Sequence, residues 1–205
     1  VLAFFTKYGF ISVNVEEDTK RYYPQNELAA SVIGFTGSDG YGIYGLEASY
    51  DEYLAGIDGR TISAKDSNGN ALPYRYSKTY PAQDGDDVYL TLDMNIQYIL
   101  EKHLQEMVTK NEVKNRGCAI LMNAKTGAIY GMATYPSFDL NSPMELADPL
   151  AKQAIEGLTD DKLDAKVIEE REKQWKNKCI SERYEPGSVF KVITSASAIE
   201  ENLID

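Results

Sequence analysis

The sequence contains few of the residues that build metal sites and disulfide frameworks. Its 205 residues include two cysteines and one histidine, His103. The cysteines, Cys118 and Cys179, could pair with each other, but two cysteines do not make a disulfide framework. Cys118 lies in an apolar run, so we expect a buried thiol there. No Cys/His spacing typical of a structural zinc site is present, so the sequence predicts neither a metal nor a cofactor.

Basic charge and long hydrophobic runs are also scarce. The chain has 21 Lys and Arg against 32 Asp and Glu, so it lacks the basic face that nucleic-acid binding needs. No stretch approaches the roughly 18 apolar residues of a membrane span, and the apolar start at residues 1–5 is too short for a signal-peptide core. Those residues resemble an interrupted element, and the chain stops just after a hydrophobic helix. We therefore expect both ends to be cuts within a longer protein.

Turn signals and periodicity divide the chain into two units, residues 1–82 and 83–205. The first is rich in Tyr, Gly and turn residues, and we expect an α+β domain there. It has no catalytic signature. Its expected elements are strands at residues 10–15 and 31–37, a turn at residues 38–40, a helix over residues 47–54 and a hairpin turn at residues 67–70.

The second unit is expected to begin with a strand at residues 88–92, followed by a helix that Asp93 can cap. His103 lies at the edge of the apolar face of this helix and is expected to be structural rather than catalytic. The residues at helical spacing that predict the buried face are Ile96, Ile99, Leu100, Leu104 and Met107.

Beyond this helix, the sequence predicts two strands, at residues 118–122 and 128–132, joined by a turn. Residues 143–178 carry interleaved acidic and basic side chains, which is typical of a solvated helical excursion. Residues 188–199 are apolar or small on all sides apart from Lys191, so we expect a helix buried in a core.

Ser188 and Lys191 are the residues whose pattern indicates chemistry. Pro186 and Gly187 form a turn, Ser188 lies where a helix begins, and residues three apart share a helix face. A serine hydroxyl is a weak nucleophile until a base takes its proton, and a lysine can do so only as the neutral amine. Burial and the positive end of the helix dipole both disfavour an ammonium ion there. The spacing therefore predicts acyl transfer with Ser188 as nucleophile and Lys191 as base.

Two other interpretations of this pair stay open. Lys191 could remain charged and donate hydrogen bonds while another group takes the proton. Ser188 could be a plain N-cap followed by a surface lysine, because roughly one chance Ser-x-x-Lys match is expected in a chain this long. The apolar surroundings of Lys191 favour the catalytic interpretation.

The octapeptide Tyr184–Lys191 resembles the nucleophile box of class B penicillin-binding proteins. Further stretches resemble the same family in the expected order along the chain. They are Arg21-Tyr22-Tyr23-Pro24, Gly34 through Gly45-Leu46-Glu47 to Gly59-Arg60, Asp84–Asp93 with Ile96-Gln97, Thr126-Gly127, Tyr135–Asn141 and Trp175-Lys176-Asn177.

This resemblance implies an α+β fold in which a pedestal (dimerisation/linker) domain, residues 1–82, precedes the first part of a penicillin-binding transpeptidase domain, residues 83–205. The latter would be an α/β domain similar to serine β-lactamases. The resemblance also implies an enzyme on the extracytoplasmic face of the bacterial cell membrane, held by an N-terminal anchor outside this chain. A membrane glycosyltransferase and other wall-synthesis proteins are its implied partners.

The resemblance further implies the reaction. Ser188 would attack the D-Ala-D-Ala carbonyl of a peptidoglycan stem peptide, Lys191 would act as the base, and a neighbouring stem peptide would take the acyl group. β-Lactam antibiotics would trap Ser188 as an acyl-enzyme. The family's Ser-x-Asn and Lys-Thr-Gly boxes are expected beyond residue 205, and Lys125-Thr126-Gly127 is a decoy in a turn. We therefore expect this polypeptide alone to be inactive.

Two alternative functions remain. A serine β-lactamase or penicillin-sensor domain would use the same pair, but the pedestal stretches argue against it, and rapid β-lactam turnover would favour it. A non-catalytic wall-synthesis interaction module would make Ser188 and Lys191 vestigial, and the intact pair argues against that.

Overall fold

The computed structural model describes residues 19–63 and 77–203, so the strand predicted at residues 10–15 and the turn predicted at residues 67–70 lie outside the described residues. The helices are α2 (Ala30–Ile33), α3 (Gly45–Ser49), α4 (Asp51–Leu54), α5 (Met94–Lys110), α6 (Pro149–Ile155), α7 (Asp160–Trp175), α8 (Lys178–Ser181), the 3₁₀ helix η1 (Gly187–Phe190) and α9 (Lys191–Glu200). The strands are β1 (Arg60–Ser63), β2 (Ser77–Tyr80), β3 (Gly117–Met122) and β4 (Ile129–Tyr135).

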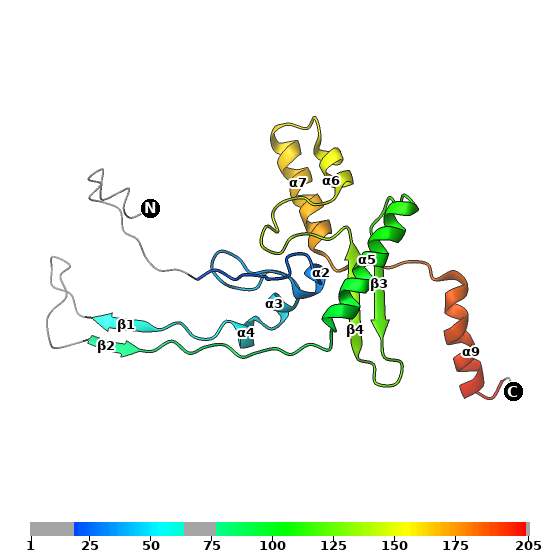
Figure 1. Cartoon of the computed structure of the whole chain (residues 1–205), viewed down its shortest axis with the longest axis horizontal. Helices are drawn as coiled ribbons and strands as arrows, with labels where there is room; N and C mark the ends of the chain where they lie inside the picture. The colour runs from blue at the N-terminus through cyan, green and yellow to red at the C-terminus, as the bar shows by residue number, and fades with distance from the viewer. Residues whose placement is uncertain (1–18, 64–76, 204–205) are drawn as a thin grey trace.

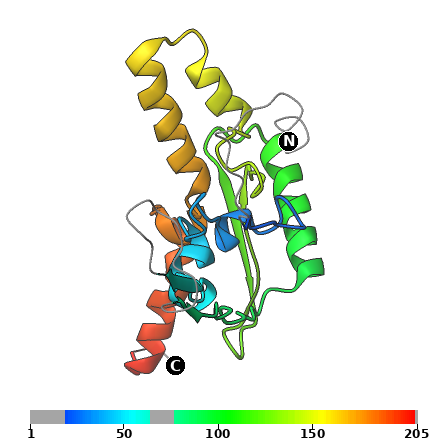
Figure 2. The same ribbon diagram turned by 90° about the vertical axis from the view of Figure 1, so that its left-hand side faces the viewer.

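The molecule is elongated, with a central body between two projecting ends (Figure 1). The antiparallel pair β1–β2 lies at one end and α9 at the other, while α5 and the antiparallel pair β3–β4 belong to the body. In the turned view, the α6–α7 pair and α9 point toward opposite ends of the molecule (Figure 2). Helices and separate antiparallel hairpins confirm the α+β prediction.

Two predicted elements of the first unit differ from the structure. Residues 30–33 are helical instead of part of a strand, because Ala30 and Ile33, three residues apart, both face the hydrophobic core. A short apolar run of this kind does not distinguish helix from strand by periodicity. The predicted helix over residues 47–54 is two short helices, α3 and α4, which meet at Tyr50. The turn at residues 38–40 is confirmed by a hydrogen bond from Gly40 N to Gly37 O.

Helix α5 begins as predicted, because the Asp93 side chain accepts hydrogen bonds from Asn95 N and Ile96 N, at 2.9 and 3.0 Å. Its buried face is rotated from the predicted one: Gln97 and Val108 are buried, whereas Ile99 and Met107 are exposed. The apolar residues predicted a different buried face because one of the two buried residues of this helix, Gln97, is polar.

The strands β3 and β4 confirm the predicted hairpin, although β4 ends three residues later than expected. The sheet face toward α5 contains Gly131, and a Cβ atom there would lie 3.0 Å from Leu100 Cδ2. No strand forms at residues 88–92. That segment runs extended beside the hairpin, where Thr91 Oγ1 donates to Ile129 O and Asp93 N donates to Tyr130 O.

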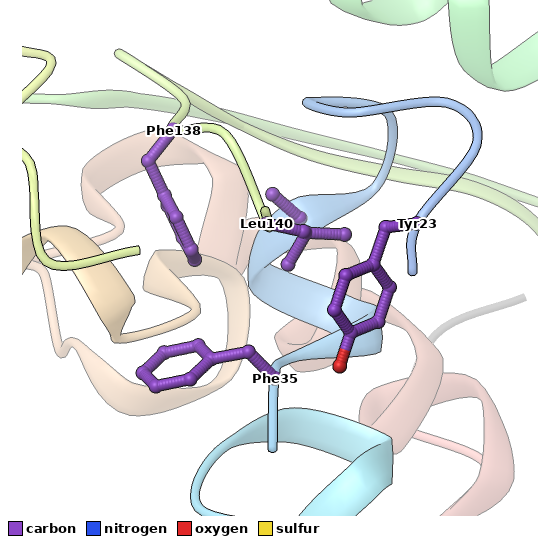
Figure 3. Packing of buried hydrophobic residues seen from close by; sticks show 5 residues of the cluster. Tyr23, Phe35, Phe138 and Leu140 are labelled. Carbon is purple, nitrogen blue, oxygen red and sulfur yellow. The ribbon is translucent and has the colours of Figure 1, made fainter. Parts of the chain in front are cut away.

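The hydrophobic core lies where the two predicted units meet. Phe35 and Phe138, from segments far apart in the sequence, pack edge to face with ring centroids 6.2 Å apart (Figure 3). Phe35 is 1% exposed and also contacts the Trp175 ring at 5.2 Å. The buried cluster is Tyr23, Ala30, Phe35, Phe138 and Leu140, with Ile33, Tyr44, Ala147 and Trp175 packed against it. We call this set the junction core.

Residues 143–178 form the helical excursion that the charge pattern predicts. Helix α7 carries a surface ion-pair network in which Lys166 and Lys173 both contact Glu169 and Glu170. Within residues 19–63 and 77–203, no helix has the length and hydropathy needed to cross a membrane.

Candidate active site around Ser188

Ser188 lies in η1, immediately before α9, as the sequence predicts. Gly187 has φ 56°, a left-handed conformation that glycine adopts without steric cost. Pro186 precedes it with φ −71°, and its carbonyl accepts a hydrogen bond from Val189 N at 3.2 Å. The Pro-Gly pair therefore turns the chain and starts the helix at Ser188.

Ser188 and Lys191 lie on one face of the helix start. In a 3₁₀ helix, side chains three residues apart eclipse each other, and Lys191 is the residue that closes η1. Lys191 is also the first residue of α9, so the pair lies at the positive end of the helix dipole. Among the described residues, no hydrogen bond joins Ser188 Oγ to Lys191 Nζ.

The expected burial of this helix is wrong for the chain as it stands. Ser188 and Lys191 are exposed, and no residue of α9 is buried. Val192 is 73% exposed and Ile193 57% exposed. Of the elements in the described part of the chain, only η1 contacts α9, so nothing covers the apolar sides that the sequence pattern shows.

The segment that leads to Ser188 is anchored at Asn177. Asn177 is buried, caps α8 by accepting a hydrogen bond from Cys179 N at 3.0 Å, and donates to Met132 Sδ at 3.1 Å. Its own carbonyl accepts a bond from Ser181 Oγ at 2.6 Å. Because alternate residues of a strand point to opposite faces, α8 lies against the face of β4 opposite to α5.

A second anchor precedes Asn177 at the end of α7. Trp175 Nε1 donates to Pro143 O at 2.8 Å, and the indole ring contacts Phe35 and Tyr44 in the junction core. The buried Gln174 accepts from Ala147 N at 2.8 Å. The end of the excursion is thus held to the core before the chain continues to Ser188.

A third anchor is Arg116, just before β3. Its guanidinium donates to Lys173 O and, at 2.7 Å, to Lys176 O. These two carbonyls lie at the end of α7, so an arginine accounts for carbonyl groups that the helix leaves unpaired. Sequence reasoning did not single out Arg116 or Gln174. An asparagine directly before a short helix was a signal for Asn177.

Three other features that the sequence analysis considered lie elsewhere in the structure: the Lys125-Thr126-Gly127 tripeptide, His103 and Cys118. Lys125-Thr126-Gly127 forms the β3–β4 turn, where Asn123 Oδ1 accepts from Lys125 N and Thr126 N, so its predicted position in a turn is confirmed. His103 is exposed on α5, with Nδ1 3.1 Å from Glu106 Oε2. Cys118 is exposed, which corrects the expected buried thiol, because within residues 19–63 and 77–203 the four-residue α8 is the only helix on that side of β3.

Two family models match the chain in sequence order. A penicillin-binding protein dimerisation domain matches residues 6–90, and a penicillin-binding protein transpeptidase domain matches residues 117–205. The second match includes the Ser188 box, and the first includes most of the residues before α5.

Individual relatives and solved structures agree with these matches. Penicillin-binding protein PbpB of Mycolicibacterium smegmatis is 34% identical over 194 residues, which cover 95% of this chain and 26% of that protein. The probable peptidoglycan D,D-transpeptidase PenA of Neisseria gonorrhoeae is 32% identical over 191 residues, covering 93% of this chain and 29% of PenA. The chain therefore spans between a quarter and a third of these relatives.

The crystal structure of penicillin-binding protein 3 from Mycobacterium tuberculosis has a similar fold. It superimposes with a TM-score of 0.61 and 30% identity, covering 90% of this chain and 32% of that one. The same protein has been solved in complex with aztreonam and with ampicillin.

A dimerisation domain followed by the start of a transpeptidase domain, with Ser-x-x-Lys at the start of a helix, defines a penicillin-binding protein. The predicted fold class is thereby confirmed. Within this class, the chain belongs to the class B penicillin-binding proteins, the family of the D,D-transpeptidases.

Proposed function

We propose that the full-length product of the gene encoding this chain is a serine-type peptidoglycan D,D-transpeptidase. Residues 1–82 belong to its pedestal and residues 83–205 begin its transpeptidase domain. The observation that carries the proposal is the common helix face of Ser188 and Lys191 at a helix N-terminus, inside a segment that matches the transpeptidase family model. PenA, a relative of this chain, bears the name of the same activity.

The proposed reaction has two acyl transfers. Ser188 Oγ attacks the D-Ala-D-Ala carbonyl of a stem peptide while the neutral Lys191 amine takes the hydroxyl proton. The peptide C–N bond breaks, the terminal D-Ala leaves with a proton, and an ester on Ser188 remains. The amine of a second stem peptide then attacks this ester, and the proton from the amine returns Ser188 to its hydroxyl form. A β-lactam acylates the same oxygen by opening its ring amide.

The setting of this chemistry follows the family. We propose that the enzyme works on the extracytoplasmic face of the cell membrane, with a membrane glycosyltransferase and other wall-synthesis proteins as partners. For the 205-residue chain alone we propose no transpeptidation. Ser188 and Lys191 are exposed, and η1 is the sole element in the described part of the chain that contacts α9, so no neighbouring element desolvates the amine.

Labelling with fluorescent penicillin tests the nucleophile. The full-length wild type is expected to be labelled, and Ser188→Ala is expected to lose labelling entirely. Ser195→Ala is the matched control, because Ser195 is another exposed serine on the same helix, and it should label like the wild type. Undiminished labelling of Ser188→Ala would place the nucleophile elsewhere.

Two substitutions of Lys191 separate a base from a fixed positive charge. A general base contributes about 10²- to 10⁴-fold, so Lys191→Ala should slow acylation by that factor. Lys191→Arg keeps the charge but cannot supply a neutral amine, so it should be equally slow. Near-normal acylation of Lys191→Arg would assign Lys191 to electrostatic stabilisation instead.

The lifetime of the acyl-enzyme distinguishes a transpeptidase from a β-lactamase. A transpeptidase keeps the acyl group long after excess drug is removed, whereas rapid hydrolysis indicates a β-lactamase.

A further inference from the structure

Cys118 and Cys179 are neighbours in space although they are far apart in the sequence. Cys179, on α8, donates from Sγ to Ala133 O at 3.4 Å and to Ala119 O at 3.7 Å. Ala119 follows Cys118 on β3, and Cys118 pairs with Thr134 on β4. The Cys179 thiol therefore lies over the strand pair at the position of Cys118.

We propose that Cys118 and Cys179 are a reversible dithiol–disulfide pair that ties α8 to β3. Both cysteines are free thiols in this structure, so the structure represents the reduced form of the proposed pair. The electron acceptor is a small-molecule or protein disulfide, of the kind found in oxidising compartments.

The different surroundings of the two thiols set the order of events. Cys118 is exposed, so it is the thiol that a disulfide donor reaches first, whereas Cys179 is half-buried. Burial, followed by the neighbouring Cys118, raises the pKa of the Cys179 thiol to about 11. Cys179 is therefore a poor first nucleophile and serves as the resolving thiol. The guanidinium of Arg116 attracts negative charge on either sulfur, and it is fixed in place by the α7 carbonyls.

The exchange balances in two steps. The Cys118 thiolate attacks one sulfur of the donor disulfide, forms a mixed disulfide and releases one donor thiolate. The Cys179 thiolate then attacks the Cys118 sulfur, which forms the intramolecular bond and releases the second donor thiolate. The chain loses two protons and two electrons in total, and the donor disulfide is reduced to two thiols.

The position of the pair gives the disulfide a structural consequence. Helix α8 leads directly to Pro186, Gly187 and Ser188. A covalent bond between α8 and β3 would add to the hydrogen bonds of Asn177 in fixing the start of this segment. The oxidised chain should therefore exchange backbone amide hydrogens of residues 178–185 more slowly than the reduced chain. The value of that restraint for catalysis rests on the proposed function, but the disulfide itself does not.

Peptide mapping of this chain after equilibration with oxidised glutathione tests the proposal. Trypsin cuts after Arg116, Lys125, Lys178 and Arg183, so Cys118 and Cys179 fall in the separate peptides 117–125 and 179–183. The expected product is these two peptides linked by one disulfide in a monomeric chain. Cys179→Ser should instead accumulate a glutathione adduct on Cys118, and Cys118→Ser should accumulate much less adduct, because Cys179 is half-buried.

Thermal unfolding provides a second measurement. Closing a loop of roughly 60 residues restricts the unfolded chain, so oxidation should raise the melting temperature by about 10 °C. The two serine variants should melt at the same temperature with and without oxidant. The proposal is overturned if both thiols of the equilibrated wild type still react with maleimide, if only disulfide-linked dimers form, or if the linked peptides appear with no change in melting temperature.

Discussion

The junction core and helix α9 both contain large apolar side chains but have opposite surroundings. Phe35 in the junction core is almost fully buried by partners from distant segments, whereas Ile193 on α9 is mostly exposed. The difference shows that hydrophobic character alone does not bury an element; a partner surface must be present. Several of the stretches that resemble the family contribute residues to the junction core, among them Tyr23, Phe138 and Trp175, whereas the Tyr184–Lys191 box lies outside it.

The hydrogen bonds of polar side chains also differ between the surroundings of the junction core and helix α9. Asn141 joins the 135–141 segment to the start of the described chain, with hydrogen bonds to Tyr23 N at 3.0 Å and to Tyr23 O at 2.9 Å. The buried Glu47 is paired with Arg21 Nε at 2.9 Å. On α9, the one side-chain hydrogen bond that the described residues show is local, from Thr194 Oγ1 to Phe190 O. The junction is held by contacts between distant segments, and α9 by its own backbone.

The largest expected effect comes from emptying the junction core. Phe35→Ala should lower the free energy of unfolding by about 3–5 kcal/mol, because it removes a buried ring and leaves a cavity among other aromatic side chains. Ile193→Ala is the counterpart on α9 and should change it by no more than about 0.5 kcal/mol. Chemical denaturation of both variants measures the difference, and equal losses would abolish the distinction between the two regions.

An intermediate effect is expected at Gln97, where a side-chain amide satisfies the free edge of β4. Gln97 accepts from Met132 N and donates to Met132 O, each at 2.8 Å, and it is 1% exposed. Gln97→Ala leaves both backbone groups buried without partners and should cost about 2–3 kcal/mol. Gln105→Ala, an exposed glutamine on the same helix, should cost less than about 0.5 kcal/mol in the same denaturation experiment. A Gln97 variant as stable as the Gln105 variant would contradict the assigned hydrogen bonds.

The smallest expected effect is the pH dependence of folding stability that Glu101 contributes. Glu101 on α5 accepts hydrogen bonds from Ala29 N and Gln97 Nε2, both at 2.7 Å, so it connects α5 to the start of α2. Burial raises the pKa of this carboxyl above its ordinary value despite these two bonds. The folded state therefore holds the proton more tightly than the unfolded state. The stability that Glu101 contributes is fully present below the unfolded pKa and is lost as pH rises through the folded pKa.

Glu101→Gln isolates this effect, because the amide oxygen still accepts but does not titrate. The wild type should lose stability relative to Glu101→Gln as the pH is raised from about 4 toward neutrality. Denaturation at a series of pH values measures the difference between the two proteins, in which the other titrating groups cancel. A difference that is constant or grows in favour of the wild type with rising pH would show that the hydrogen bonds outweigh burial.

The features that the sequence predicts correctly are local ones. Asp93 as an N-cap, the β3–β4 hairpin with its Asn123 turn and the helix start at Ser188 each depend on a few adjacent residues. The errors arise where distant segments decide the outcome. Residues 30–33 are helical because their apolar face meets Phe35 and Leu140, and the α5 stripe is rotated because Gln97 bonds to a strand.

At the candidate site, too, the sequence predicts local features but not the contacts between distant segments. The Ser-x-x-Lys spacing and the turn before it were visible in the sequence, but the burial of Lys191 depends on what covers α9, which no local pattern contains. The anchors Arg116, Gln174 and Asn177 act through backbone carbonyls and side chains far away in the sequence. Such contacts become visible only once the segments are placed in space.

Locating the drug on the protein decides whether Ser188 is the acylated nucleophile. The full-length product is incubated with ampicillin, digested, and the modified peptide is sequenced by mass spectrometry. We expect one adduct, carried by Ser188 in the peptide that follows Arg183. An adduct on any other residue, or stable binding with no covalent adduct at all, would contradict it.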